Sequence, residues 1–412
     1  MQIIYFVQYF IPEKAAGLPL VEDLLDGYVK SGFDVKVFTP TPTRGISKEE
    51  RNILKKKKIE RKYDGKLVIH RMALYREKTG FVSRALRYFI FSLECLWKGF
   101  TEPGEIIFTG SGPPTQGVIV GIVRKFTKKK FIYNLQDIFP DSLVNAGITH
   151  EGSVVWKLGR KMEKFSYKQA DKIIVISEDF KNNLLAKGVP SEKIEVIPNW
   201  VNTNNVYPIP RKDNSLIKKY SLNPDKFYIC YSGNIGYTQN IELLIEVAEE
   251  IKENIPDIAF IIIGEGAAKN KLNDYIEEKK LTNIILLPYQ PYEKLAEVFS
   301  IGDVGLVISK AGIGENSIPS KTWDIMAAGR PVLASFDEKS ELNKIVNQVN
   351  CGIAVDAGNK EDLIKAIYAL YNNHKLQEIY GANGLKYVKT YLNKNNCVDR
   401  YIKVTKEVIC TN

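Results

Sequence analysis

One short segment holds a cation, a carboxylate and the turn residues needed to position both. Residues 317–334 read Ser-Ile-Pro-Ser-Lys-Thr-Trp-Asp-Ile-Met-Ala-Ala-Gly-Arg-Pro-Val-Leu-Ala. Ser320 is a residue type that caps helix N-termini, and Gly329 followed by Pro331 is typical of a helix end. The segment therefore predicts a helix of about two turns followed by a buried strand at Val332–Ala334.

Lys321 and Asp324 lie about one turn apart in this predicted helix. Lys321 falls in the first turn, beside free backbone N–H groups and the positive end of the helix dipole, which suits a phosphate. Asp324 is close enough to share a pocket with it and can accept hydrogen bonds from ribose hydroxyls. Together they indicate a nucleotide-sugar site. The alternative for Lys321 is a solvated surface lysine.

A glycine-containing loop follows an apolar run earlier in the same half of the chain. Tyr231-Ser-Gly-Asn-Ile-Gly236 lies between a predicted strand and the amphipathic helix expected at Ile241–Lys252. Glycines in such a loop allow the backbone to approach a pyrophosphate closely. Gly233, Asn234 and Gly236 are therefore candidate ligands, although many strand–helix turns contain two glycines without binding anything.

Two further strand ends in this half carry candidate residues. Gly264-Glu265-Gly266 lacks the third glycine of a dinucleotide fingerprint, because Lys269 occupies that position. An NAD-dependent dehydrogenase is therefore not indicated. Pro288 and Tyr289 could stack against a nucleotide base, or could simply shape a loop.

Strand ends in the first half point to a second substrate. Residues 13–18, which include Ala16 and Gly17, form a small-residue loop that either reaches a ligand or makes a plain turn. Asp137 leaves an apolar strand at its carboxyl end and could orient or deprotonate a substrate hydroxyl. Asp141 follows a proline, and capping of the next turn is the alternative role for it.

The segment from Asp324 to Val332 resembles a known motif. Retaining glycosyltransferases of family 4, which have the GT-B fold, carry Glu-x7-Glu followed by a short Ala/Gly/Pro stretch. Asp324 stands in place of the second Glu, Asn316 aligns with the first, and Glu315 is an adjacent substitute. The Pro-Ser-Lys form is similar to bacterial capsule and O-antigen amino-sugar transferases.

The resemblance implies a retaining hexosyltransferase of surface polysaccharide synthesis. Its donor would be a UDP-sugar, with N-acetylated and deoxy hexoses as candidates because Asn316 replaces a glutamate that relatives use on the hexose. Its acceptor would be a lipid-pyrophosphate-linked saccharide. Catalysis is expected from Asp137 and Lys321, and acceptor binding from Ala16, Gly17 and Asp137. The expected donor-binding residues are Gly233, Asn234, Gly236, Gly264, Glu265, Pro288, Tyr289, Glu315, Asn316, Ser320, Lys321 and Asp324.

The expected chemistry needs no cofactor other than the donor. Relatives place an Arg and a Lys in the first phosphate loop, where this chain has Asn234 and Gln239. Lys321 is therefore the main candidate for neutralising the diphosphate. No Asp-x-Asp occurs, so the usual Mg²⁺ or Mn²⁺ clamp of other transferases is not expected. In the family's accepted picture the acceptor attacks on the face that UDP leaves, and no protein nucleophile is required.

Apolar runs alternate with helical patterns along the chain, which is typical of parallel α/β folds. The runs predicted as strands are 3–6, 35–38, 66–69, 106–108, 131–134, 173–176 and 194–197 in the first half, and 228–231, 259–263, 284–287, 304–308, 332–334 and 353–355 in the second. We expect two doubly wound, Rossmann-like domains facing each other across a cleft, the GT-B arrangement. Residues 1–200 would bind the acceptor and residues 201–394 the nucleotide-sugar. On the resemblance alone, the helix in residues 395–412 would return to the first domain.

Charge and cysteine content bear on location. The net charge is +10, and residues 51–100 hold 14 Lys and Arg against 4 Asp and Glu, including Lys55–Lys58. Such an excess attracts anionic lipid, and it lacks a recognised nucleic-acid-binding module. The helix expected at residues 81–100 either lies in a membrane interface or packs in the core. Five scattered cysteines and no signal-peptide pattern favour the cytoplasm, with peripheral contact at the inner membrane face.

One rival function shares this fold. A nucleotide-sugar epimerase would use the same donor site and would convert the sugar without any acceptor. It should carry carboxylates or histidines around the sugar ring, whereas His70, His150 and His374 are far apart in sequence. The sequence does not decide between a glycosyltransferase and a nucleotide-sugar epimerase.

Overall fold

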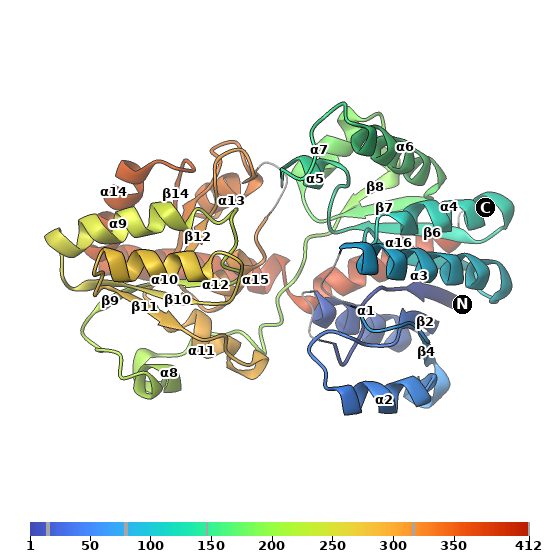
Figure 1. The fold of residues 1–412 in the computed structure, drawn as a ribbon, viewed down its shortest axis with the longest axis horizontal. Coiled ribbons are helices and arrows are strands. Elements are labelled where there is room, and N and C mark those ends of the chain that lie inside the picture. The colour runs from blue at the N-terminus through green and yellow to red at the C-terminus, as the bar shows by residue number, and fades with distance from the viewer. Residues whose placement is uncertain (14–16, 78–80, 146, 315–317, 411–412) are drawn as a thin grey trace. The chain divides into compact units, whose positions relative to one another are not determined.

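The computed structural model describes residues 1–13, 17–77, 81–145, 147–314 and 318–410. The chain forms two compact units (Figure 1). Unit 1 comprises Met1–Pro198 and Asn395–Asn412, and unit 2 comprises Asn199–Lys394. The break falls two residues before the boundary expected after residue 200, and the last helix belongs to unit 1.

Unit 1 contains an eight-stranded sheet in its described residues, in the order β3-β4-β2-β1-β5-β6-β7-β8. Its strands are β1 (Gln2–Phe6), β2 (Asp34–Pro40), β3 (Ile59–Lys62), β4 (Leu67–Met72), β5 (Ile106–Gly110), β6 (Lys130–Leu135), β7 (Lys172–Val175) and β8 (Ile194–Val196). Seven of them match predicted apolar runs. The edge strand β3, antiparallel to β4, was not predicted, because Ile-Glu-Arg-Lys is polar and partly exposed. Edge strands commonly carry such charges.

Helices cover both faces of this sheet. They are α1 (Leu18–Lys30), α2 (Lys48–Lys56), α3 (Phe81–Thr101), α4 (Thr115–Phe126), α5 (Asp141–Asn145), α6 (Val154–Gln169), α7 (Glu178–Ala186) and α16 (Lys394–Cys410). α3, α4 and α6 pack side by side as one layer. On the other face α16 lies against α1, where the Tyr28 and Thr405 hydroxyls are 2.8 Å apart.

Unit 2 has a six-stranded parallel sheet in its described residues, in the order β11-β10-β9-β12-β13-β14. Its strands are β9 (Phe227–Ser232), β10 (Ile258–Ile263), β11 (Ile284–Leu287), β12 (Val304–Ile308), β13 (Val332–Ser335) and β14 (Gly352–Val355). All six were predicted as apolar runs. Strands buried on both faces carry continuous apolar sequence, which makes them easy to recognise.

The helices of unit 2 form one layer on each face of this sheet. They are α8 (Ser215–Lys219), α9 (Ile241–Asn254), α10 (Lys269–Glu278), α11 (Leu295–Phe299), α12 (Lys321–Ala327), α13 (Glu341–Val349), α14 (Lys360–Tyr371) and α15 (His374–Tyr391). One apolar cluster includes Leu244, Leu272 and Ile367, from α9, α10 and α14. The other includes Trp323 and Val388, from α12 and α15.

The strand order places the predicted donor residues together. From β9 the chain proceeds outward through β10 to β11, then returns to β12 on the other side of β9. The switch point therefore lies between β9 and β12, where α/β sheets bind ligands beyond the carboxyl ends of their strands. The loop after β9 holds Gly233, and the segment after β12 leads to Lys321.

Candidate active site

Lys321 is the central side chain of the candidate site. Its Nζ atom lies 3.8 Å from the centre of the Tyr231 ring, a cation–π contact at the end of β9. Within the described residues it has no ion-pair partner, and burial lowers its pKa from 10.5 to about 7. A buried amine without a counter-anion favours an incoming anion that restores its charge.

The glycine loop after β9 leaves room for this lysine. A Cβ atom at Gly233 would lie 2.8 Å from the Lys321 Nζ atom, and φ at Gly233 is +146°. The Tyr231 hydroxyl donates to the Asn234 carbonyl at 2.6 Å, which ties the loop to the ring beneath Lys321. The φ angle at position 233 favours glycine, and any larger residue there would have to displace the end of the Lys321 side chain.

The loops after β9 and β10 pack backbone against backbone. A Cβ atom at Gly264 would lie 1.9 Å from the Gly233 oxygen, and one at Gly266 would lie 2.2 Å from the Ile235 oxygen. The Ile235 N–H donates to the Glu265 carbonyl at 2.9 Å. The predicted residues Gly233 and Gly264 are therefore brought together, with Glu265 in the same pair of loops.

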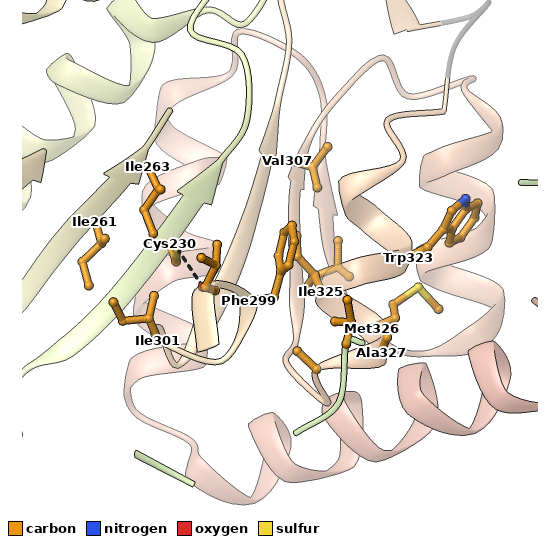
Figure 2. Close-up of a cluster of buried hydrophobic side chains, with 14 of the residues drawn as sticks. Cys230, Ile261, Ile263, Phe299, Ile301, Val307, Trp323, Ile325, Met326 and Ala327 are labelled. Atoms are coloured by element: carbon orange, nitrogen blue, oxygen red, sulfur yellow. Dashed lines mark hydrogen bonds between the residues drawn. The ribbon is translucent and has the colours of Figure 1, made fainter. Parts of the chain in front are cut away.

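α12 is held rigidly by its apolar side. Trp323, Ile325 and Met326 are buried in one core cluster with Phe299 and other residues (Figure 2). The helix ends as predicted at Gly329, where φ is +64° and the N–H donates to the Met326 carbonyl at 3.0 Å. Lys321 is therefore positioned by a packed element of the fold.

Ser320 does not cap α12, which corrects the prediction. Its φ and ψ angles of −55° and −29° are helical, and its side chain accepts no capping hydrogen bond. An N-cap needs extended backbone angles for its hydroxyl to reach the N–H groups of the first turn. Its predicted part in donor binding is a separate matter and stays a prediction.

Asp324 lies three residues after Lys321 on α12. Burial raises its pKa from 3.8 to about 7. Within the described chain, no hydrogen bond or ion pair joins the side chains of Lys321 and Asp324. The site thus holds a cation and a carboxyl group, neither neutralised by the other. Each costs free energy when charged, and each is suited to a polar ligand.

The remaining donor candidates have mixed surroundings. Pro288 and Tyr289 are exposed beyond the end of β11, so Tyr289 is free to stack. Glu265 is ion-paired with Lys269 at 2.7 Å. Gly236 donates from its N–H to the Gln239 side chain at 3.0 Å, within the first glycine loop. Of the other predictions, Ala16, Glu315 and Asn316 lie outside the described residues.

The acceptor candidates belong to unit 1. Asp137 follows β6 and is exposed as a residue, but partial burial of its carboxyl group raises the pKa, against a hydrogen bond from Ser142 that lowers it. A raised pKa suits a group that exchanges a proton.

Gly17 precedes α1 with φ +79°, and an added Cβ atom there would meet nothing within 4 Å, so a turn requirement explains this glycine. α1 begins at Leu18, directly after this glycine.

Asp141 belongs to a charge network. Its carboxylate lies 2.8 Å from Lys187 and 3.3 Å from Arg160, and Glu163 lies 2.6 Å from both. Burial acts to raise the pKa of Asp141, but the hydrogen bonds from Lys187 and Asn183 outweigh it and lower the pKa. A cavity of about 470 Å³ adjoins this network, lined by Arg160, Glu163 and Lys187 among others. The cavity is formed by residues of unit 1.

Several polar residues in unit 1 could not be picked out from the sequence. Gln8 follows β1 and is buried, and neither end of its amide has a partner among the described residues. Arg44 lies 3.9 Å from the Tyr9 ring centre and 2.9 Å from Glu77. No motif marks these residues, and the contacts of Arg44 form only when the loops after β1, β2 and β4 lie together.

The described residues offer neither a metal centre nor a membrane span. Among them, no group of three or more His, Cys, Asp or Glu side chains could hold a metal ion. In the same part of the chain, no helix combines the length and apolar character that membrane spanning requires.

Two family models match the chain in succession. The model for Glycosyltransferase Family 4 matches residues 20–205, and the model for Glycosyl transferases group 1 matches residues 212–387. Among similar proteins, the probable glycosyltransferase WbjE of Pseudomonas aeruginosa is 25% identical, over 66% of this chain and 66% of that protein. The putative colanic acid biosynthesis glycosyl transferase WcaI of Escherichia coli is 26% identical, over 68% and 69%.

Solved structures share the fold over the whole chain. Sucrose-phosphate synthase from Thermosynechococcus elongatus has a TM-score of 0.75 at 16% identity, and each chain is covered completely. Anabaena Alr3699/HepE, solved in complex with UDP, has a TM-score of 0.73 at 13% identity, covering 99% of this chain and 100% of that one. The predicted GT-B fold is confirmed. The two family models together span most of the sequence, and the chain belongs to the family 4 glycosyltransferases.

Proposed function

We propose that this glycosyltransferase moves a hexose from a UDP-sugar to a lipid-pyrophosphate-linked saccharide during synthesis of a surface polysaccharide. The observation that carries the donor proposal is Lys321, partly buried over Tyr231 without an ion-pair partner in the described residues, beside the glycine loop. Two similar proteins support it by their names: one acts in colanic acid biosynthesis, and one was solved with UDP.

The proposed chemistry is electrostatic. Charged Lys321 neutralises the diphosphate as the sugar–oxygen bond breaks, which stabilises the leaving group without moving a proton to it. Asp324 accepts hydrogen bonds from the ribose, and Tyr289 stacks on the base. The acceptor hydroxyl attacks on the face that UDP leaves, so the configuration at the sugar is retained. No metal or further cofactor takes part.

The acceptor is assigned to unit 1. Asp137 orients the acceptor hydroxyl and accepts its proton, which its raised pKa favours. Ala16 and Gly17 approach the acceptor from the loop before α1. We place the enzyme in the cytoplasm, at the inner face of the membrane, where a lipid-linked acceptor would be found.

The test is a UDP-release assay over a panel of UDP-sugars, with and without a membrane extract as acceptor. UDP release should require the extract and should persist in EDTA. Lys321→Ala should lower kcat about 100-fold, the usual cost of removing one transition-state partner. The exposed Lys339→Ala is the matched control and should keep normal turnover. Conversion of the sugar without acceptor would identify an epimerase and refute the proposal, as would normal turnover by Lys321→Ala.

A further inference from the structure

α3 exposes a continuous stripe of large apolar side chains. Five residues on it are exposed, with Trp97 67% and Phe89 58% accessible. The five are Leu86, Phe89, Leu93, Trp97 and Phe100. Successive members are three or four residues apart, so they line one side of the helix over most of its length.

The stripe is separate from the side of α3 that forms the core. Arg87, Phe91 and Cys95 are completely buried on the opposite side. Phe91 and Cys95 pack in the main apolar cluster of unit 1. α3 is therefore apolar on two sides, and only one of them packs in the core of unit 1. Core packing, one of the two alternatives expected for this segment, is confirmed for the buried side of the helix.

The neighbouring helices extend the exposed apolar surface. α4 packs against α3 and ends with Phe126, which is 69% exposed. α6 packs against α4 and exposes Val154 and Leu158 near its start. We call the exposed side of these three helices the α3–α4–α6 surface; the helices themselves are labelled in unit 1 of Figure 1.

The charge of this surface is strongly positive. The three helices carry ten Lys and Arg against two Glu, and six of the ten are exposed: Arg84, Lys125, Lys157, Lys161, Lys164 and Lys168. One of the two Glu residues, Glu163, is buried in ion pairs. Aromatic and aliphatic side chains flanked by lysines match the boundary of an anionic bilayer, where apolar groups enter and cations meet phosphates.

We propose that the α3–α4–α6 surface docks the enzyme on an anionic lipid bilayer. Trp97 and Phe89 enter the headgroup–acyl boundary, and the lysines of α4 and α6 contact the lipid phosphates. The inference rests on the proposed function only in explaining why docking is useful, since a lipid-linked acceptor would be held in the same bilayer.

The test is vesicle sedimentation without donor or acceptor. Vesicles of phosphatidylcholine with phosphatidylglycerol should bind the protein, and vesicles of phosphatidylcholine alone should bind it far less. The double variant Phe89→Ser/Trp97→Ser should weaken binding at least about tenfold. The control Ile379→Ser/Tyr391→Ser, which removes exposed apolar residues of α15, should bind normally. Thermal denaturation establishes that both variants are folded.

Tryptophan fluorescence gives an independent measurement. Trp200 and Trp323 are buried, whereas Trp156 on α6 is partly exposed. In a Trp156→Phe background the vesicle-dependent blue shift should therefore come from Trp97 and largely disappear when Trp97→Phe is added. The proposal would be overturned if the natural protein did not bind vesicles or if Phe89→Ser/Trp97→Ser bound them as tightly as the natural protein. It would also be overturned if the control variant lost as much binding as Phe89→Ser/Trp97→Ser. A stripe variant that dissociates a dimer while binding vesicles normally would overturn it too. Because no UDP-sugar is present, failure here leaves the UDP-release result unaffected.

Discussion

At the scale of single residues, partial burial of Lys321 lowers its pKa to near neutrality. A bound diphosphate stabilises the ammonium form and raises this pKa from its ligand-free value of about 7. At about pH 8 most free Lys321 is neutral, so UDP binding should take up a proton. For the same reason UDP affinity should weaken as the pH rises above 7.

Calorimetry in buffers of different ionisation enthalpy measures this proton directly. The apparent heat of UDP binding should differ between two buffers for the natural protein. Lys321→Arg keeps the charge at every accessible pH, so its heat should be the same in both. A buffer-independent heat for the natural protein would show that Lys321 does not change its protonation on binding.

Asp324 should lower the stability of the free protein. Its pKa is raised from 3.8 to about 7, so between these values the folded protein binds more protons than the unfolded chain. Stability from this group therefore falls as the pH rises through that window. Above it, Asp324→Asn should raise the free energy of unfolding by on the order of 1 kcal/mol, and the gain should shrink toward pH 4.

Urea unfolding at several pH values checks the Asp324 prediction. Asp225→Asn, in an exposed loop of the same unit, is the control and should change little. An Asp324→Asn protein that is no more stable than the natural one above neutrality would contradict it. The charged Asp324 carboxylate lowers the free energy of unfolding, and binding sites commonly keep such destabilising groups because function requires them.

At the scale of elements, the glycine loop and α12 act together. Gly233→Ala would place a methyl group 2.8 Å from the Lys321 Nζ atom and would also strain a φ of +146°. UDP affinity should fall at least about tenfold because the lysine is displaced. Gly358→Ala is a matched control: φ is +85° and nothing lies within 4 Å, so it isolates backbone strain. Calorimetry of UDP binding to both variants separates backbone strain from displacement of the lysine. Equal UDP affinities of Gly233→Ala and Gly358→Ala would argue against the contact between position 233 and Lys321.

Much of this element-level structure could be predicted from sequence, for identifiable reasons. Parallel strands buried on both faces gave continuous apolar runs, and Gly329 marked the end of α12. The cap by Ser320 was wrong, since residue type does not fix backbone angles. The contact between Lys321 and Tyr231 could not be foreseen, because it depends on β9 lying beside β12, an order that sequence alone does not reveal.

At the scale of the whole molecule, the last helix completes the core of the first unit. The Tyr401 ring lies 6.2 Å from Phe108, and its hydroxyl donates to the Asn134 side chain at 3.2 Å. α16 also lies against Gly27 of α1, where an added Cβ would be 2.2 Å from the Val398 Cγ1 atom. Residues at opposite ends of the sequence thus share one packed interface.

A double-mutant cycle tests this interface. Gly27→Ala should destabilise the protein by about 1–3 kcal/mol through overpacking, although alanine in an exposed helix would stabilise it. Val398→Ala alone should also destabilise, because it leaves a cavity. The two changes together should cost clearly less than their sum, since the smaller side chain at 398 makes room for the methyl group at 27. Urea unfolding of all four proteins gives the coupling energy. Additive effects would mean that α16 does not pack on α1 in this way, because only residues in contact couple strongly.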